Sequence, residues 1–589
     1  MSKKQTNLSQ KAMNCLLPMF LVVMFVFLLS RVFSFLLISP DDIGMKSIIS
    51  GVFTGTPDGH CVFIRYPLAA ALAFLYQLVP VLDWYNIFLL GCYVLCFFLV
   101  FRRFCRLHGA KSYAYLGLSL VVLAIMFTQN IINLEWTVTA GLLGATAIYR
   151  YCTIPELTSP WKRFCEYFIC LLLLALGFCL RHTVVLMYIP LAFICWVKRL
   201  ADANTQARYE KRKTYIWEIS FLCTACLAVV GILIAHNFAY SSEDWKAYSE
   251  YTEDRSALFD YYGYPNYDTY QEEYEKAGIS YETYILMCTD YNFAIPTDHF
   301  EEIDLHAIAE LAKSIHTDQS LPQRLENCYN KFYSIVTDND VSLIFVLLLI
   351  LLSYNLFVVA KGNHGAYLYI TAVIMWFCGI CFYLLFKNRL PTRVALCCLF
   401  GIIAALSGNA FTYHANQIYI APPSRDIKLW LSRSLMGLLV CVLLAGQTHQ
   451  IYKENKGAVT LAVSNDYLAT YCNEHSDNLY FYDFWSFSQR GSFFLSSVKS
   501  PNYVRSGGWM YNSPAYDEML EQYDCYDLID AIKKNQNIFY LVTTHRSEDV
   551  IARLNAYFES IGEPIVAVVT DSFNTTVEEA VVIWFQYAS

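Results

Sequence analysis

Two adjacent carboxylates, Asp41 and Asp42, stand just past the first long apolar run of the chain, at residues 14–38. Enzymes use carboxylates as proton acceptors and as ligands for hard cations. An acidic side chain at the mouth of a membrane span is costly to place unless it serves a function. Local structure explains the pair equally well, because Ser39 and Pro40 suit the start of a helix whose dipole favours acids in its first turn. The residues alone leave both explanations open.

Charged residues also separate later apolar runs. Arg389 and Arg393 lie in one short turn between two runs, and Arg181 and His182 lie in another. We place both turns on the outer side of the membrane, where Lys and Arg are uncommon, and this position indicates a function. Interfacial anchoring of long side chains is the alternative. Glu135 begins a further run, where it either takes part in a site or is an ordinary helix-start acid.

The composition is that of an integral membrane protein. Of the 589 residues, 56% are hydrophobic and 16% are charged, whereas soluble chains carry roughly 25% charged residues. The formal net charge of −8 and the absence of a basic stripe exclude nucleic acid as a partner. Because about 20 apolar residues cross a bilayer, we predict a polytopic α-helical membrane protein with about eleven transmembrane helices. The predicted spans are residues 14–38, 84–106, 113–129, 135–151, 166–180, 183–198, 215–240, 341–360, 364–386, 394–412 and 429–447.

Residues 66–82 decide the topology. This stretch is apolar but short, and Pro67 and Pro80 interrupt it. If it is an interfacial helix and not a span, the N-terminus and five Lys- and Arg-rich segments fall on one side, as the positive-inside rule requires of the cytoplasmic side. We therefore predict a multi-pass plasma-membrane protein with a cytoplasmic N-terminus and an extracytoplasmic C-terminus. The absence of eukaryotic targeting signals indicates a bacterial membrane.

The chain accordingly divides into four parts. They are a transmembrane module at 1–240 with a first outer loop at 39–83, a large outer loop at 241–340, a second transmembrane module at 341–447 and an outer domain at 448–589. The large loop is acidic, rich in Tyr and too long for a connector. We expect helices at 268–277 and 298–315 in this loop. Glu253, Asp254, Arg255 and Asp260 either line a cleft or belong to a solvated acidic face.

The outer domain alternates strand-like and helix-like runs, which is typical of a small α/β domain. The predicted strands are residues 459–463, 478–482, 537–542, 564–569 and 581–585, and the predicted helices are residues 464–474, 515–533 and 547–561.

The first outer loop continues with apolar residues at helical spacing over 45–53, which predicts an amphipathic helix on the membrane surface. This order of features resembles the GT-C superfamily of membrane glycosyltransferases, in particular the branch of protein O-mannosyltransferases and lipid A sugar transferases. Asp41-Asp42 resembles the acidic pair of that family, which is usually Asp-Glu. Arg65-Tyr66-Pro67-Leu68 resembles its Pro-Pro-Leu element, with Tyr-Pro in place of Pro-Pro, and Glu135 resembles the acid of its next outer turn. The resemblance covers residues 14–240.

The resemblance implies an enzyme that transfers a sugar from a polyprenyl-phosphate donor to an envelope glycan, lipid or protein at the outer membrane face. Asp41 is then the base for the acceptor hydroxyl, and Asp42 supports it or holds a divalent metal ion. Cationic side chains stabilise the phosphate leaving group, and an acid helps to bind the acceptor. These substrate-binding residues are Arg389, Arg393, Arg181, His182, Arg65 and Glu135.

Two other classes of function stay open on the sequence. A transporter or flippase is expected to have repeated halves and spans broken by Gly or Pro, and we find no such pseudo-symmetry. A non-catalytic envelope scaffold or sensor would bind a partner through the Tyr-rich loop and the outer domain. The position of Asp41 discriminates between these functions, because a transferase needs this carboxylate in a pocket with a basic residue opposite.

Overall fold

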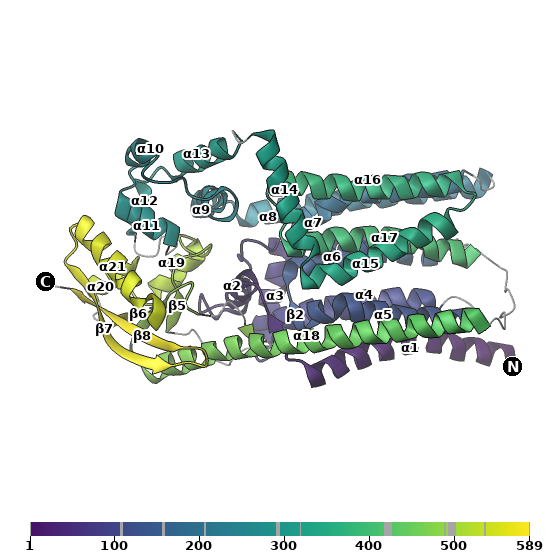
Figure 1. The fold of residues 1–589 in the computed structure, drawn as a ribbon, viewed down its shortest axis with the longest axis horizontal. Helices are drawn as coiled ribbons and strands as arrows, with labels where there is room; N and C mark the ends of the chain where they lie inside the picture. Colours follow the sequence, from purple (N-terminus) through teal and green to yellow (C-terminus); the bar gives the residue numbers. More distant parts are fainter. Residues whose placement is uncertain are drawn as a thin grey trace.

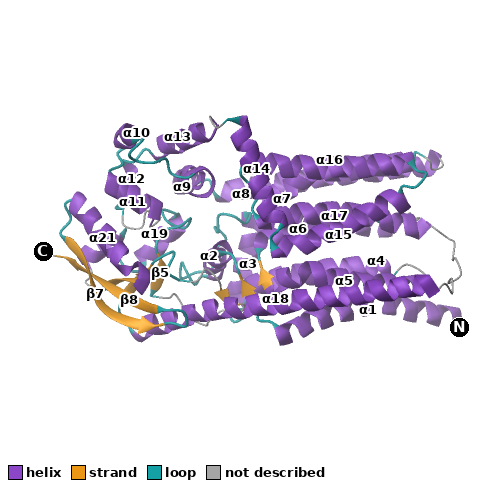
Figure 2. Cartoon of the chain, in the orientation of Figure 1, coloured by secondary structure: helices purple, strands orange, loops and turns teal. Residues whose placement is uncertain are grey.

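A computed structural model describes residues 2–105, 110–155, 159–204, 208–289, 295–317, 320–416, 427–487, 491–492, 502–534 and 537–587. Long helices run side by side through one half of the molecule, and a region of short helices and strands, here called the cap, lies at one end of them (Figure 1). The strands lie in the cap and at its border with the long helices (Figure 2). The C-terminus lies in the cap, and the N-terminus lies at the opposite end of the bundle.

Apolar side chains dominate the long helices, as lipid requires of segments that must satisfy their own backbone hydrogen bonds. Six helices in the described part of the chain are long and apolar enough to cross a membrane. This confirms a polytopic helical membrane protein, while the number of eleven spans stays a prediction. The bundle helices are α1 (Ser2–Val32), α4 (Trp84–Phe104), α5 (Ala110–Ile132), α6 (Trp136–Cys152), α7 (Pro160–Ala203), α8 (Arg208–Ala239), α15 (Asn339–Tyr354) with its continuation η2 (Asn355–Val359), α16 (His364–Phe386), α17 (Thr392–Asn416) and α18 (Ile427–Glu474).

Helix α7 is a hairpin made of two helices. Arg181 interrupts it with the non-helical angles φ −146° and ψ 94°. The guanidinium carbon of Arg199 lies 5.9 Å from the ring of Tyr167, although a straight helix would separate these residues by about 48 Å. The chain therefore reverses at Arg181, between the two spans that the sequence predicts at 166–180 and 183–198.

Buried ion pairs hold the bundle together at the end opposite to the cap. Glu166 accepts a hydrogen bond of 2.8 Å from Arg103 and another from Arg150. Glu218 is fully buried and pairs with Arg199. Each carboxylate has a cationic partner, because an unpaired charge at such a place is costly.

Two short helices follow the first span at the border of the bundle and the cap. Helix α2 (Pro40–Ser50) ends at Gly51, whose φ of 78° lies in the left-handed region that favours glycine. Helix α3 (Tyr66–Leu78) has 13 residues and is therefore about 20 Å long, which is too short for a hydrocarbon core of about 30 Å. Its length agrees with the interfacial helix predicted at 66–82.

The large outer loop folds into short helices of the cap. They are α9 (Glu243–Ser256), η1 (Ala257–Tyr262), α10 (Gln271–Lys276), α11 (Tyr281–Thr289), α12 (Thr297–Glu301), α13 (Leu305–Thr317) and α14 (Leu321–Val336). The helix predicted at 268–277 corresponds to α10, and the helix predicted at 298–315 is divided into α12 and α13. Many of the loop tyrosines pack on one another; for example, the ring centroids of Tyr267 and Tyr274 lie 5.2 Å apart.

Helix α18 continues from the bundle far into the cap, so the strand predicted at 459–463 is wrong. The apolar run favoured a strand, but one buried face continues through it at helical spacing, and this packing overrides the local preference. The buried side chains of that face are Ile451, Asn455, Ala458, Ser464, Leu468 and Cys472. The helix predicted at 464–474 is the last part of α18.

The C-terminal part of the cap is built from five strands and three helices in its described residues. Its sheet has the order β5-β3-β6-β8-β7, with β3 parallel to β5 and β6, and β8 antiparallel to β6 and β7. The strands are β3 (Leu479–Tyr482), β5 (Tyr503–Arg505), β6 (Ile538–Thr543), β7 (Ile565–Asn574) and β8 (Glu579–Tyr587). The helices are α19 (Pro514–Glu521), α20 (Leu528–Lys534) and α21 (Thr544–Ser560). The single helix predicted at 515–533 is two helices, and between them Asp524 has a left-handed φ of 55° that no helix continues.

One hydrophobic core joins the outer loop to this domain, since Leu258 and Tyr274 belong to the same buried cluster as Leu554 and Phe558. The two outer segments therefore fold together as one cap.

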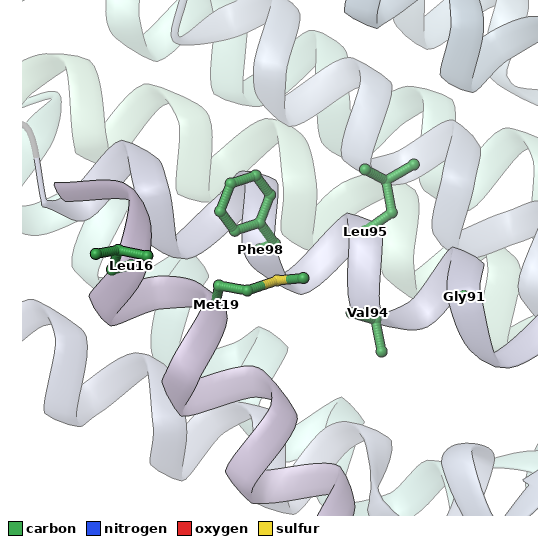
Figure 3. Close-up of a pocket in the computed structure, with 6 residues that line it drawn as sticks. All are labelled: Leu16, Met19, Gly91, Val94, Leu95 and Phe98. Carbon is green, nitrogen blue, oxygen red and sulfur yellow. The ribbon is translucent and has the colours of Figure 1, made fainter. Parts of the chain in front are cut away.

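A hollow of about 430 Å³ lies between α1 and α4 within the bundle. It is lined by Leu16, Met19, Gly91, Val94, Leu95 and Phe98, none of which has a polar side chain (Figure 3).

Candidate active site

A small sheet at the border of the bundle and the cap brings two distant segments together. Strand β1 (Leu36–Leu37) pairs in parallel with β2 (Asn133–Leu134) and antiparallel with β4 (Gly491–Ser492). In a parallel pair, the residues that follow the two strands emerge at the same end. Asp41 comes shortly after β1 and Glu135 directly after β2, so the pairing places both carboxylates at one edge of this sheet.

Arg393, in the first turn of α17, lies between these two carboxylates. Its Nη1 is 3.5 Å from Oδ2 of Asp41 and 3.4 Å from Oε1 of Glu135. The Asp41 side chain is 19% exposed, whereas that of Glu135 is almost fully buried. The cap of α2 is supplied by Ser39, whose Oγ accepts the backbone N–H of Asp41 at 3.2 Å. The Asp41 carboxylate therefore does not cap its own helix and has a basic partner opposite.

Asp42 is fully buried behind this group. Its Oδ1 accepts hydrogen bonds from the Tyr85 hydroxyl at 2.6 Å and from the backbone N–H of Trp136 at 3.2 Å. Burial raises the pKa of Asp42 well above its usual value; the charge of Glu135 adds to this rise, and the bond from Tyr85 opposes it. Asp42 thus fixes α2 against the residue that follows Glu135, which fits the supporting role that the family resemblance implies.

Oδ1 of Asp42 already accepts two protein donors, which a metal ion on this oxygen would have to displace. In the described ranges there is also no group of three or more His, Cys, Asp or Glu side chains placed to hold a metal ion. Metal dependence therefore stays an untested prediction, and we derive no step through a metal.

A second buried ion pair holds α2 against α4. Lys46 Nζ lies 2.5 Å from Oδ2 of Asp83. Asp83 also accepts the Tyr76 hydroxyl at 2.9 Å and the side-chain amide of Asn86 at 2.7 Å. These bonds connect α2, α3 and α4 directly behind the acidic pair. The sequence analysis missed them, although an Asp immediately before a predicted span is a recognisable helix cap.

Arg181, at the turn of the α7 hairpin, lies beside the acidic pair. Its guanidinium carbon is 4.2 Å from the ring centroid of Trp136, the residue after Glu135. Among the residues that the structure describes, no carboxylate lies within ion-pair distance of this guanidinium. A cation that is held on an aromatic face and has no paired acid is available to an anionic ligand.

Arg65 and His182 lie close to the same turn. The backbone N–H of Arg65 donates to the carbonyl of Cys179 at 2.8 Å, and Nε of Arg65 is buried without a hydrogen-bond partner. The ring of His182 lies 6.1 Å from that of Phe178. The structure therefore gathers three of the predicted basic residues, Arg65, Arg181 and His182, around one hairpin turn.

Arg389 is held by the outer loop and not by the acids. Its guanidinium carbon lies 4.0 Å from the ring centroid of Tyr261 in η1. The adjacent Asn388 donates from Nδ2 to the Tyr261 carbonyl at 3.3 Å, and in the same element Asp260 pairs with Arg255 at 3.5 Å. Of the two arginines predicted in the 387–393 turn, Arg393 therefore joins the acidic group, and Arg389 connects that turn to the cap.

Aromatic rings of the cap close over α2. Phe63 lies 5.6 Å from Trp136 and 4.8 Å from Trp509, measured between ring centroids. Gly44 approaches Trp509 so closely that a Cβ at this position would be 2.6 Å from the indole ring. These contacts limit the access of water to a site that is otherwise built from charged side chains. Trp509 and Tyr85 were missed by the sequence analysis, because only the folded chain brings Trp509 to Gly44 and Tyr85 to Asp42.

No protein-family model matches the sequence, and none of the curated proteins does. The solved structures include two that are similar in fold, both crystal structures of ArnT from Cupriavidus metallidurans. The apo structure is 12% identical, covers 97% of this chain and 98% of its own, and has a TM-score of 0.35. The structure bound to undecaprenyl phosphate is 10% identical, covers 96% and 97%, and has a TM-score of 0.38. Because both TM-scores are below 0.5, we derive the function from this chain's own side chains.

Proposed function

We propose that this chain is a membrane glycosyltransferase that moves a sugar from a polyprenyl-phosphate donor to a hydroxyl of an envelope glycan, lipid or protein at the outer membrane face. The observation that carries the proposal is the position of the Asp41 carboxylate, which faces Arg393 at the mouth of the bundle with the unpaired Arg181 nearby. A proton acceptor and a free cation thus lie together where lipid meets the cap. A transporter or a scaffold has no need of this combination.

In the proposed reaction the acceptor hydroxyl attacks the anomeric carbon of the donor sugar. Its proton passes to the Asp41 carboxylate as the new glycosidic C–O bond forms. The bond between the anomeric carbon and the phosphate oxygen breaks at the same time, and its electron pair leaves with the polyprenyl phosphate. Arg181 and Arg65 stabilise the charge that develops on this phosphate, and a single displacement of this kind inverts the anomeric centre.

The remaining residues hold these groups in place. Arg393 orients the Asp41 carboxylate and neutralises the buried Glu135, which lies within reach of a hydroxyl of the acceptor. Asp42 fixes the backbone of Trp136, whose ring carries Arg181. The base and the phosphate-binding cation are therefore positioned through one short chain of contacts, as preorganised catalysis requires.

The proposal is tested in cells that carry the wild-type gene, lack it or express Asp41→Asn. We expect mass spectrometry of envelope glycolipids and glycans to show one sugar modification that is lost in the deletion strain and in Asp41→Asn, since a general base contributes roughly 10²–10⁴-fold to the rate. Asp268→Asn, at an exposed acid in the outer loop, is the matched control and should retain the modification. A wild-type level of the modification in Asp41→Asn would refute the proposal.

A further inference from the structure

A second cavity, separate from the hollow in the bundle, lies where the outer loop meets α16. Its volume is about 510 Å³, within the range of small-molecule sites. The cavity is lined by η1, the end of α13, one face of α14 and the C-terminal end of α16 with the turn after it. Its lining contains Arg324, Lys331 and His316 and several amide and hydroxyl groups, but no Asp or Glu. Donors and cations without acids are the composition of a site for an anion.

Helix α14 places this cavity at the cap end of the bundle helices (Figure 1). The helix lies across the cap end of the bundle, at an angle to α15 and α16 (Figure 1). Its outer face is apolar and exposed, and Leu321, Leu325 and Tyr329 repeat on it every four residues. Such a face suits the interfacial region of a bilayer. The opposite face carries Arg324 and Lys331, spaced by seven residues, into the cavity.

Arg324 is preorganised for an anionic ligand. Its guanidinium carbon lies 3.7 Å from the ring centroid of Phe386, and Nη2 donates to the Phe386 carbonyl at 3.5 Å. Its Nε is buried and has no hydrogen-bond partner among the residues that the structure describes. In the described part of the chain, neither Arg324 nor Lys331 has a carboxylate within ion-pair distance. The ring of Tyr262, 5.2 Å from that of His316, adds an aromatic wall.

We propose that this cavity binds the phosphate-bearing headgroup of a lipid in the outer leaflet. The phosphate is held by Arg324 and Lys331, and the acyl chains extend along the apolar face of α14. Tyr261 lines the cavity and also carries Arg389 on its ring, so the cavity lies beside the 387–393 turn that leads to Arg393. The site goes beyond the proposed transferase, because it needs no sugar donor and no Asp41.

The test measures binding of dioctanoyl phosphatidic acid to the purified full-length protein in detergent by isothermal titration calorimetry. We expect it to bind at least tenfold more tightly than dioctanoylglycerol, which lacks the phosphate. Arg324→Gln combined with Lys331→Gln should weaken binding of the phosphatidic acid at least tenfold. Lys276→Gln combined with Lys313→Gln removes two exposed lysines of the same outer loop and should change it less than twofold.

A second variant keeps the charges and fills the space. Ser334→Phe at the cavity wall should also weaken binding of the phosphatidic acid. Unchanged binding in both the double variant and Ser334→Phe would overturn the proposal. Competition by inorganic phosphate at the same concentration as the lipid would overturn the assignment to a lipid headgroup and indicate a site for free anions. Asp41→Asn should bind the lipid like the wild type, so failure here is distinct from failure of the transferase proposal.

Discussion

Replacing Arg393 with Gln removes the cation that lies between Asp41 and Glu135. The loss of folding free energy depends mainly on Glu135, whose charge is left buried. The Glu135 side chain is only 4% exposed and lies 3.4 Å from Arg393. Breaking a buried ion pair costs about 3–5 kcal/mol, because the remaining charge stays buried without a partner. Arg393 is itself 36% exposed, so water can reach the orphaned carboxylate, and we expect a smaller loss of about 1–3 kcal/mol.

Thermal unfolding of the detergent-solubilised protein, followed by tryptophan fluorescence, measures this loss. One kcal/mol lowers the melting temperature by about 2–4 °C for a cooperative unit of about 150–250 residues, so Arg393→Gln should melt roughly 2–12 °C below the wild type. Adding Glu135→Gln removes the buried charge and should restore at least half of the difference. Arg389→Gln, at an exposed side chain, is the control and should change stability by no more than about 0.5 kcal/mol. A double variant that melts as low as Arg393→Gln would refute the explanation by charge.

Three further predictions concern the surroundings of the site. Because the folded-state pKa of Asp42 is raised, its contribution to stability is complete below the unfolded-state pKa and is lost as the pH rises through the folded-state pKa. The melting temperature should therefore fall more steeply with rising pH for the wild type than for Asp42→Asn. Equal slopes for the two proteins would contradict this. Glu166→Gln removes the carboxylate that pairs with two buried arginines and should lower the free energy of unfolding by about 3–5 kcal/mol. The destabilised protein should aggregate on size-exclusion chromatography. A monodisperse variant that melts like the wild type would be inconsistent with the buried network. Gly44→Ala forces a Cβ against Trp509 and should lower the free energy of unfolding by about 1–3 kcal/mol. Proteolysis of the cap should then be faster. Resistance to protease equal to that of the wild type would argue against this contact.

The membrane architecture was the most predictable part, because few structures can pair all backbone N–H and C=O groups inside a lipid bilayer. Long apolar runs became helices, and the short run at 66–82 became the 13-residue helix α3. The α7 hairpin was predictable for the same reason, since Arg181 and His182 separate two apolar runs. The strand predicted at 459–463 failed because the helix that ends the bundle extends into the cap, where its packing face outweighs local β preference.

The candidate site was predictable in its members but not in its geometry. Charges at the mouths of spans singled out Asp41, Glu135, Arg181 and Arg393. Their meeting depends on the pairing of β1 with β2, and two-residue strands leave no recognisable signal in a sequence. The different directions of Asp41 and Asp42 follow from helix geometry, in which neighbouring residues point about 100° apart. Which of the two would pair with Arg393 depended on Tyr85 and Trp136, which are distant in the chain and hold Asp42.

The central claim is that Asp41 accepts a proton from an acceptor as a sugar leaves a polyprenyl phosphate. Its most direct test is a reconstituted assay in which the purified protein in proteoliposomes receives a synthetic polyprenyl-phosphate sugar and an envelope lipid extract. Mass spectrometry then counts the polyprenyl phosphate released and the sugar transferred. We predict equal amounts of both products for the wild type and a rate at least about 100-fold lower for Asp41→Asn, with donor binding unchanged. A rate for Asp41→Asn within twofold of the wild type would contradict the account.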